Sequence, residues 1–374
     1  MLIGVPKEIK NHEYRVGLTP ESVAELVGID QSVLVETNAG AGIGASDADY
    51  QAAGARIAAT PAEVFAAADM IIKVKEPQAN ERAMLRAGQI LYTYLHLAPD
   101  PEQTRDLLAS GAICIAYETV TGEGGGLPLL KPMSQVAGRL SIQVGAKSLQ
   151  KDAGGRGVLL GGVPGVAPAK VVIIGGGDVG FNAAQMAVGM QADVTILERD
   201  AAVIERLSRH FGASAKVLRS TPAVLTDLVT SADMVIGAVL IPGAEAPKLV
   251  TRDMLPKMLE GSVLVDVAID QGGCFETSRP TTHDDPTFII DGVVHYCVAN
   301  MPGAVARTST YALNAATIPH AKNIARRGWK QALNADPHLR NGLNVCHGKL
   351  TCAAVGEALG IETVSPSTLL AQMG

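Results

Sequence analysis

Residues 171–180 read VVIIGGGDVG, in which a short apolar run leads directly into a cluster of glycines. Gly175, Gly177 and Gly180 fit the spacing GxGxxG, and the helix-like segment FNAAQMAVGM follows. A strand, a glycine turn and a helix in this order direct backbone N–H groups at the helix N-terminus towards a phosphate. The stretch therefore predicts a dinucleotide-binding turn, and the alternative is a purely structural strand–helix turn.

The next strand-like run, DVTILE (193–198), adds an acidic residue to this pattern. Glu198 ends the run at about the 20-residue spacing where an acid binds the hydroxyls of the adenosine ribose. Because an acid at this place disfavours a 2′-phosphate, we expect NAD rather than NADP as the cofactor. Asp178 lies inside the turn, and since its carboxylate would repel a pyrophosphate, we expect it to point to solvent.

Strand-like and helix-like segments alternate along the chain, as they do in proteins built from βαβ units. Strands that are buried on both faces of a sheet read as near-continuous apolar runs. The candidate strands are 2–5, 32–36, 70–75, 90–95, 112–118, 170–175, 193–198, 233–239, 262–268 and 287–291. We predict an α/β protein of two doubly wound, Rossmann-like domains with parallel sheets and a cleft between them.

The boundary between the two domains is expected near the helix-like stretch 131–150, which leads into a loop rich in Gly and Pro at 152–168. A long loop of this kind in a compact protein is usually functional or a linker. We predict a substrate and catalytic domain of residues 1–130 plus 306–374, whose helix-like tail packs back on the first half. The NAD-binding domain is predicted over 131–305.

Composition limits the classes of partner. The 374 residues carry a net charge of -6, which argues against nucleic acid, because nucleic acid requires a basic surface. The five cysteines show neither CxxC nor zinc-ligand spacing, so we expect reduced thiols, no metal site and a cytoplasmic location. A charge at Lys7 rules against a signal peptide, and no apolar run reaches the length of a membrane helix. We therefore expect a soluble protein with no membrane partner.

Polar residues follow several of the predicted strands, at the sheet edge where ligands bind in open α/β folds. His96 follows the run 90–95, Lys75 ends the run 70–75, and Asp270 follows the run 262–268. Histidine exchanges protons near neutral pH, so His96 is a candidate general base. Each of the three also has an ordinary structural explanation, such as a capping or solvated side chain. Asp266, within its strand, is a competing candidate for Asp270.

Glu118 also ends a predicted strand, but the sequence pairs it with no role. Arg15 lies in the charged segment GVPKEIKNHEYRVGLTP (4–20). A guanidinium there can bind a carboxylate with two hydrogen bonds, and a surface ion pair is the alternative.

The segment 4–20 resembles the N-terminal signature of alanine dehydrogenases and of the soluble α part of nicotinamide nucleotide transhydrogenases, and VVIIGGGDVGFNAA resembles their second signature. The similarity extends over essentially the whole chain, and alanine dehydrogenase is the better fit. It implies that His96 and Asp270 are catalytic and that Arg15 and Lys75 bind the substrate. The implied substrates are L-alanine, pyruvate and ammonium, and the implied assembly is a homohexamer.

The same resemblance implies a set of residues that contact NAD. They are Ser134, Gly175, Gly177, Asp178, Val179, Gly180, Glu198, Ser220, Val239, Leu240, Val267, Ala268, Ile269, Asp270, Val298, Ala299, Asn300 and Met301. The chain departs from the family at four places: the family usually has Asp at 198, an apolar residue at 178, Ala at 17 and, near the adenosine end, a basic residue at 203. Three other functions remain open from sequence. They are a transhydrogenase nucleotide-binding subunit, a related dehydrogenase of a larger amino acid, and a non-enzymatic NAD sensor.

Overall fold

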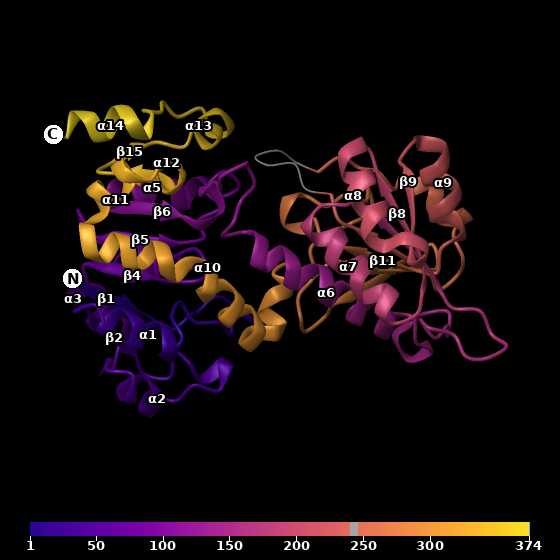
Figure 1. The fold of residues 1–374 in the computed structure, drawn as a ribbon, viewed down its shortest axis with the longest axis horizontal. Coiled ribbons are helices and arrows are strands. Elements are labelled where there is room, and N and C mark those ends of the chain that lie inside the picture. The colour runs from indigo at the N-terminus through magenta and orange to yellow at the C-terminus, as the bar shows by residue number, and fades with distance from the viewer. Residues whose placement is uncertain (240–245, 374) are drawn as a thin grey trace. The chain divides into compact units, whose positions relative to one another are not determined.

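The computed structural model describes residues 1–239 and 246–373, and the chain divides into two compact units. Unit 1 comprises Met1–Met133 together with the chain from Gly303 onward, and unit 2 comprises Ser134–Pro302. Each unit contains one sheet with helices packed around it (Figure 1). The predicted α/β class is confirmed. One predicted cofactor residue, Leu240, lies outside the described residues.

The unit 1 sheet has eight strands in the order β15-β14-β6-β5-β4-β1-β2-β3. β1 to β6 are parallel in the doubly wound order, so the strand order reverses between β1 and β4. These strands are β1 (Leu2–Val5), β2 (Ser32–Glu36), β3 (Arg56–Ala58), β4 (Met70–Ile72), β5 (Ile90–Thr93) and β6 (Ile113–Ala116). The helices between them are α1 (Pro20–Val27), α2 (Asp47–Ala52), α3 (Pro61–Ala67), α4 (Ala79–Arg82) and α5 (Pro101–Ser110).

The chain from Gly303 completes unit 1. Its long helix α10 (Ala306–Arg327) runs across one face of the sheet (Figure 1), where the Tyr92 hydroxyl of β5 donates to the carbonyl oxygen of Thr317 at 3.3 Å. The two last strands extend the sheet as antiparallel edge strands, which the parallel prediction did not include. The remaining elements are α11 (Trp329–Ala335), α12 (Pro337–Arg340), β14 (Leu343–Cys346), β15 (Lys349–Leu350), α13 (Ala353–Leu359) and α14 (Pro366–Gln372).

Unit 2 repeats this topology with seven strands in the order β12-β13-β11-β10-β7-β8-β9. All neighbours are parallel except β12 and β13, and the strand order reverses between β7 and β10. The strands are β7 (Lys170–Ile174), β8 (Asp193–Glu198), β9 (Lys216–Arg219), β10 (Met234–Gly237), β11 (Val263–Asp266), β12 (Thr287–Ile290) and β13 (Val293–Tyr296). The helices are α7 (Asp178–Gly189), α8 (Ala201–Phe211) and α9 (Pro222–Ser231), and α6 (Lys131–Ser148) enters this unit from the end of unit 1.

Each unit has its own apolar core, which the sheet residues dominate. In unit 1 the core includes Ile71, Leu91 and Cys114, and in unit 2 it includes Val172, Val235 and Leu264, all fully or almost fully buried. Side chains on both faces of these strands are buried because helices cover both faces, which explains the near-continuous apolar runs in the sequence.

Several strands end earlier than predicted, and this places the polar candidates in loops. The run 70–75 forms a strand only to Ile72, and the run 90–95 only to Thr93. Lys75 and His96 therefore lie just beyond the carboxyl ends of β4 and β5. These two strands are neighbours in the sheet, which is the arrangement that brings side chains of their following loops together.

Candidate functional site

The loops after β4 and β5 stay paired beyond the strand ends, and these two loops carry Lys75 and His96. The amide of Tyr94 donates to the carbonyl oxygen of Val74 at 3.2 Å, and the Thr93 hydroxyl donates to the carbonyl oxygen of Lys75 at 2.9 Å. The ring of Tyr94 lies parallel to that of His96, with the centroids 5.7 Å apart. The structure thus brings two of the predicted residues to one edge of the unit 1 sheet.

Arg15 follows β1, which borders β4 at the point where the strand order reverses. Its side chain is 2% exposed, and its Nε and Nη2 atoms donate to the two carboxylate oxygens of Glu13 at 2.7 and 2.6 Å. Nη1 also contacts the sulfur of Met133 at 3.0 Å. Burial lowers the pKa of the Arg15 guanidinium, but the hydrogen bonds and the charge of Glu13 outweigh burial and raise that pKa. Arg15 therefore remains a fixed cation despite being buried.

Glu13 fixes the orientation of the Arg15 guanidinium. Because Glu13 occupies the Nε edge, the guanidinium is held in one orientation by a bidentate, charge-assisted pair. Tyr94 stacks on His96, and its hydroxyl donates to the carbonyl oxygen of Leu129 at 2.5 Å. Arg15 follows β1, and Tyr94 and His96 follow β5, so all three lie in segments beyond the carboxyl ends of strands in the unit 1 sheet. The sequence offered no signal for Glu13 beyond its presence two residues before Arg15.

A buried ionic network supports the loop that carries Lys75. Lys73 is fully buried, and its Nζ atom donates to Glu81 at 2.7 Å and to Glu8 at 3.1 Å. The other carboxylate oxygen of Glu8 accepts the amide of Val74 at 2.7 Å. Burial lowers the pKa of the Lys73 ammonium, but the two carboxylates outweigh it and raise that pKa, so the cation persists. Lys75 is mostly buried, and its Nζ atom lies 4.0 Å from Glu76.

The glycine turn of unit 2 has the geometry that the sequence pattern predicts. Gly175 has a φ of 102°, and a Cβ there would lie 2.6 Å from the carbonyl oxygen of Ala238 after β10. A Cβ on Gly180 would overlap the carbonyl oxygen of Gly175. At Gly177, which caps α7, no heavy atom of the described residues lies within 4 Å of the Cβ position. Two glycines are thus required by packing, whereas the third borders open space at a helix N-terminus.

This arrangement fits the pyrophosphate of a dinucleotide. The turn follows β7 where the strand order of unit 2 reverses, and the helix behind it supplies N–H groups and a favourable dipole for an anion. Asp178 is exposed to solvent. Ser134 lies on α6, which approaches the turn closely because Gly138 leaves room for the carbonyl oxygen of Val179.

Glu198 ends β8, and its carboxylate is held by backbone N–H groups. One oxygen accepts the amide of Gly176 within the glycine turn at 2.7 Å, and the other accepts the amides of Arg199 and Asp200 at 2.6 and 3.1 Å. The extra methylene of Glu relative to Asp lets the carboxylate reach the turn. Its backbone carbonyl accepts the amide of Ser220 at 2.8 Å, so the two predicted residues lie side by side.

The segment after β11 contains four of the predicted cofactor residues and begins at a buried carboxylate. Asp270 lies in a 3-10 turn, Ile269–Gln271. The side chain of Asp266 accepts the amides of Ala268 and Cys274 at 3.1 and 2.9 Å, which closes the segment into a loop. Asp266, which the sequence offered as an alternative to Asp270, is fully buried. It organises the loop, whereas Asp270 is exposed on it.

The remaining predicted cofactor residues follow β10, β11 and β13. Val239 borders Gly175, and the amide of Val267 donates to the carbonyl oxygen of Gly237 at 3.0 Å. Val298 pairs with Thr281 in an isolated bridge, and Asn300 has a φ of 64°. Ala299 and Met301 flank Asn300. These residues all belong to loops after strands of the unit 2 sheet, where the fold places nucleotides.

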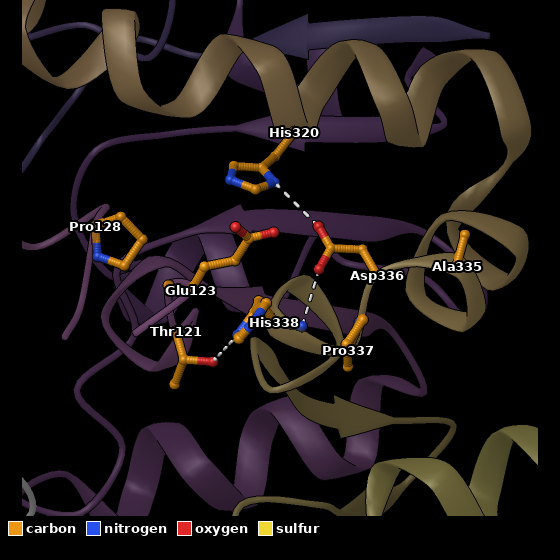
Figure 2. Close-up of a pocket in the computed structure, with 9 residues that line it drawn as sticks. Thr121, Glu123, Pro128, His320, Ala335, Asp336, Pro337 and His338 are labelled. Carbon is orange, nitrogen blue, oxygen red and sulfur yellow. Dashed lines mark hydrogen bonds and ion pairs between the residues drawn. The ribbon is translucent and has the colours of Figure 1, made fainter. Parts of the chain in front are cut away.

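Unit 1 also has a surface pocket of about 440 Å³ (Figure 2). His338 is within hydrogen-bond distance of the Thr121 hydroxyl at 2.9 Å, and His320 lies 4.0 Å from Asp336. None of the residues predicted for the site lines it.

In the described part of the chain, no three His, Cys, Asp or Glu side chains are placed to hold a metal ion. Similarly, no helix within residues 1–239 and 246–373 is long and apolar enough to span a membrane.

The fold and the turn define the class: a two-unit α/β protein whose second unit has a dinucleotide-binding architecture. Comparison with known proteins identifies the family. The chain matches the N-terminal domain of the alanine dehydrogenase/PNT family over residues 4–137 and the C-terminal domain over residues 141–353. The protein therefore belongs to the alanine dehydrogenase/PNT family, as the sequence signatures indicated.

Relatives with solved structures or curated names agree with this assignment. The chain is 60% identical to an alanine dehydrogenase from Halomonas elongata over 99% of this chain and 100% of that protein. It is 52% identical to an alanine dehydrogenase from Mycolicibacterium smegmatis, with the same coverage. A solved L-alanine dehydrogenase superposes with a TM-score of 0.93 at 50% identity, covering 96% of this chain and 99% of that one. A Sinorhizobium meliloti transhydrogenase gives 0.79 at 25% identity, covering 94% of this chain and 98% of that one.

Proposed function

We propose that this protein is an NAD-dependent L-alanine dehydrogenase. The reaction converts L-alanine, NAD⁺ and water reversibly into pyruvate, ammonium, NADH and a proton. The observation that carries the proposal is the cluster of Arg15, Lys75 and His96 in the segments that follow β1, β4 and β5, which are adjacent parallel strands of the unit 1 sheet. The full-length likeness to alanine dehydrogenases supports it, and the cluster has the charges that an amino acid and its oxo acid require.

The residues of unit 1 would bind and activate the substrate. Arg15, held in one orientation by Glu13, would bind the substrate carboxylate with two hydrogen bonds. Lys75 would donate to the carboxylate or to the oxygen that becomes the carbonyl of pyruvate, and so stabilise charge as it develops. His96 would accept a proton from the water that attacks the imine, and then assist the loss of ammonia.

The residues of unit 2 would hold the cofactor. The amides at the start of α7 and the space beside Gly177 suit the pyrophosphate, and Glu198 suits the adenosine ribose. The residues predicted at 267–270 and 298–301 would contact NAD. Asp270 would bind the substrate amine or the nicotinamide ribose and share proton transfer with His96. The nicotinamide ring, when bound, supplies the hydride acceptor for the reaction. We propose that Ser134, Ser220, Val239 and Leu240 also contact NAD.

Two further proposals concern the state of the protein. All five cysteines are free, which suits a reducing compartment such as the cytoplasm. The family resemblance favours a homohexamer, and light scattering of the purified protein measures its mass directly. A mass of one or two chains would contradict the hexamer.

The test of function follows the NADH absorbance of purified protein mixed with pyruvate and ammonium, with NADPH in a parallel series. We expect rapid loss of NADH only when both pyruvate and ammonium are present, and little reaction with NADPH. His96→Ala and Asp270→Asn should each reduce kcat about 10²- to 10⁴-fold, the usual contribution of acid–base groups. Binding of NADH without turnover in the wild-type protein would contradict the proposal and favour a transhydrogenase-like or sensor role.

A further inference from the structure

His96 has a backbone conformation that is uncommon for residues other than glycine. Its φ is 49°, in the left-handed region, where a side chain with a Cβ is disfavoured. Strained residues of this kind persist only when their surroundings hold them in place, and they gather at functional sites. The side chain of His96 is 42% exposed, so packing of the imidazole itself supplies little of that restraint.

The restraint comes from polar side chains that bind the backbone on both sides of His96. The Glu118 carboxylate accepts the amide of His96 at 2.7 Å and the amide of Leu95 at 3.2 Å. Gln103 donates to the carbonyl oxygen of Leu95 at 2.6 Å, and Thr104 donates to the carbonyl oxygen of Leu97 at 3.0 Å.

These three side chains come from two elements that the chain places around the loop. Gln103 and Thr104 are fully buried in the first turns of α5, and Glu118 lies in the 3-10 turn Tyr117–Thr119 after β6. Glu118 is the only one of the three that bonds to His96 itself. Its nearest carboxylate oxygen is 3.9 Å from Nδ1 of the imidazole, which is too long for a hydrogen bond. Glu118 therefore hydrogen-bonds the peptide of His96 and not its ring.

We propose that Glu118 is a positioning residue for His96: it holds the peptide of His96 in the left-handed conformation that aims the imidazole. The inference rests on the proposed function, in which His96 transfers protons. A carboxylate suits this task because it accepts two neighbouring amides at once, and charge-assisted bonds are the stronger ones. The sequence places Glu118 at a strand end but shows no partner for it, because Leu95 and His96 approach it only in the folded sheet.

The experiment compares Glu118→Ala, Glu118→Gln and Glu118→Asp with a control, Glu102→Gln, in reductive amination of pyruvate. Glu102 is an exposed carboxylate of the same unit that pairs with Arg82. Gln keeps an acceptor oxygen at the original reach, whereas Asp keeps the charge but is one methylene shorter. We expect kcat to fall about 10- to 100-fold in the Ala and Asp variants, the scale of a small misplacement of a reacting group, and less in the Gln variant. The Kd of NADH should stay within about 2-fold, since the proposed cofactor residues belong to unit 2.

A double-variant cycle separates positioning from a general structural role. If Glu118 acts through His96, Glu118→Gln should cause no further loss of kcat in a His96→Ala background. An independent loss in that background, or a smaller loss with Asp than with Gln, would overturn the proposal even if the Ala variant fails to fold. Wild-type kcat in the Glu118 variants would overturn it while leaving the proposed function intact. An inactive wild-type protein would overturn both.

Discussion

Substituting the glycines of the turn one at a time separates the requirements of the fold from those of the cofactor. Gly180 and Gly177 both match GxGxxG, but the structure gives them opposite surroundings. A Cβ on Gly180 would overlap the carbonyl oxygen of Gly175, which is rigid backbone. A Cβ on Gly177 would meet none of the described residues within 4 Å, and its φ of -69° and extended ψ are accessible to alanine.

The expected magnitudes follow from these contacts. Gly180→Ala should lower the free energy of unfolding of unit 2 by about 1–3 kcal/mol or more, because overpacking against fixed atoms displaces backbone. Gly177→Ala should change that free energy by less than about 1 kcal/mol, since reduced freedom of the unfolded chain offsets the poorer N-cap. The added methyl group occupies the space where we place the pyrophosphate. Loss of one hydrogen bond to a charged group, about 1.5–3 kcal/mol, weakens NADH binding about 10- to 100-fold.

Two measurements on the same samples test this reasoning. Calorimetry or circular dichroism reports the unfolding of both units, whereas fluorescence of the single tryptophan, Trp329, reports unit 1. Titration with NADH measures the Kd. We expect Gly177→Ala to melt like the wild type and to bind NADH weakly. If this variant binds NADH as tightly as the wild type does, the space beside Gly177 is not the pyrophosphate site.

Three further perturbations test other parts of the structure. Arg15→Ala should raise the KM for pyruvate about 10²- to 10⁴-fold, as expected for the loss of two hydrogen bonds of about 1.5–3 kcal/mol each, and an unchanged KM would count against the carboxylate role. Lys73→Met should destabilise unit 1 by about 3–5 kcal/mol, because it leaves Glu8 and Glu81 buried without their cation; a smaller change in chemical denaturation would show that the network contributes little. Burial lowers the pKa of His295 in the folded state, so its protonation disfavours folding. Stability should therefore fall as the pH drops below the unfolded-state value of about 6.5, and the fall should be shallower in His295→Gln; equal slopes would refute the assignment.

Much of the architecture could be predicted from the sequence because its signals are local. The apolar runs of β7 and β8, the glycines between β7 and α7, and Glu198 at the end of β8 all lie within one short segment. The sequence did not predict β3 (RIA) or β9 (KVLR), and both of these strands are short and carry charged residues. Such segments become strands because a neighbouring strand offers hydrogen bonds, and that neighbour is not visible in their own sequence.

The sequence by itself determined the α/β class, the dinucleotide turn and the polar residues at strand ends, because periodicity and turn chemistry are properties of contiguous residues. Only the tertiary structure decided how these residues are held. Glu13 fixes Arg15, Glu8 fixes the loop of Lys75, and Glu118 fixes His96. Two of these contacts join residues that are 22 and 66 positions apart. Such partners are selected by the order of strands in the sheet and by burial, which strengthens the bond between charged groups that water no longer screens.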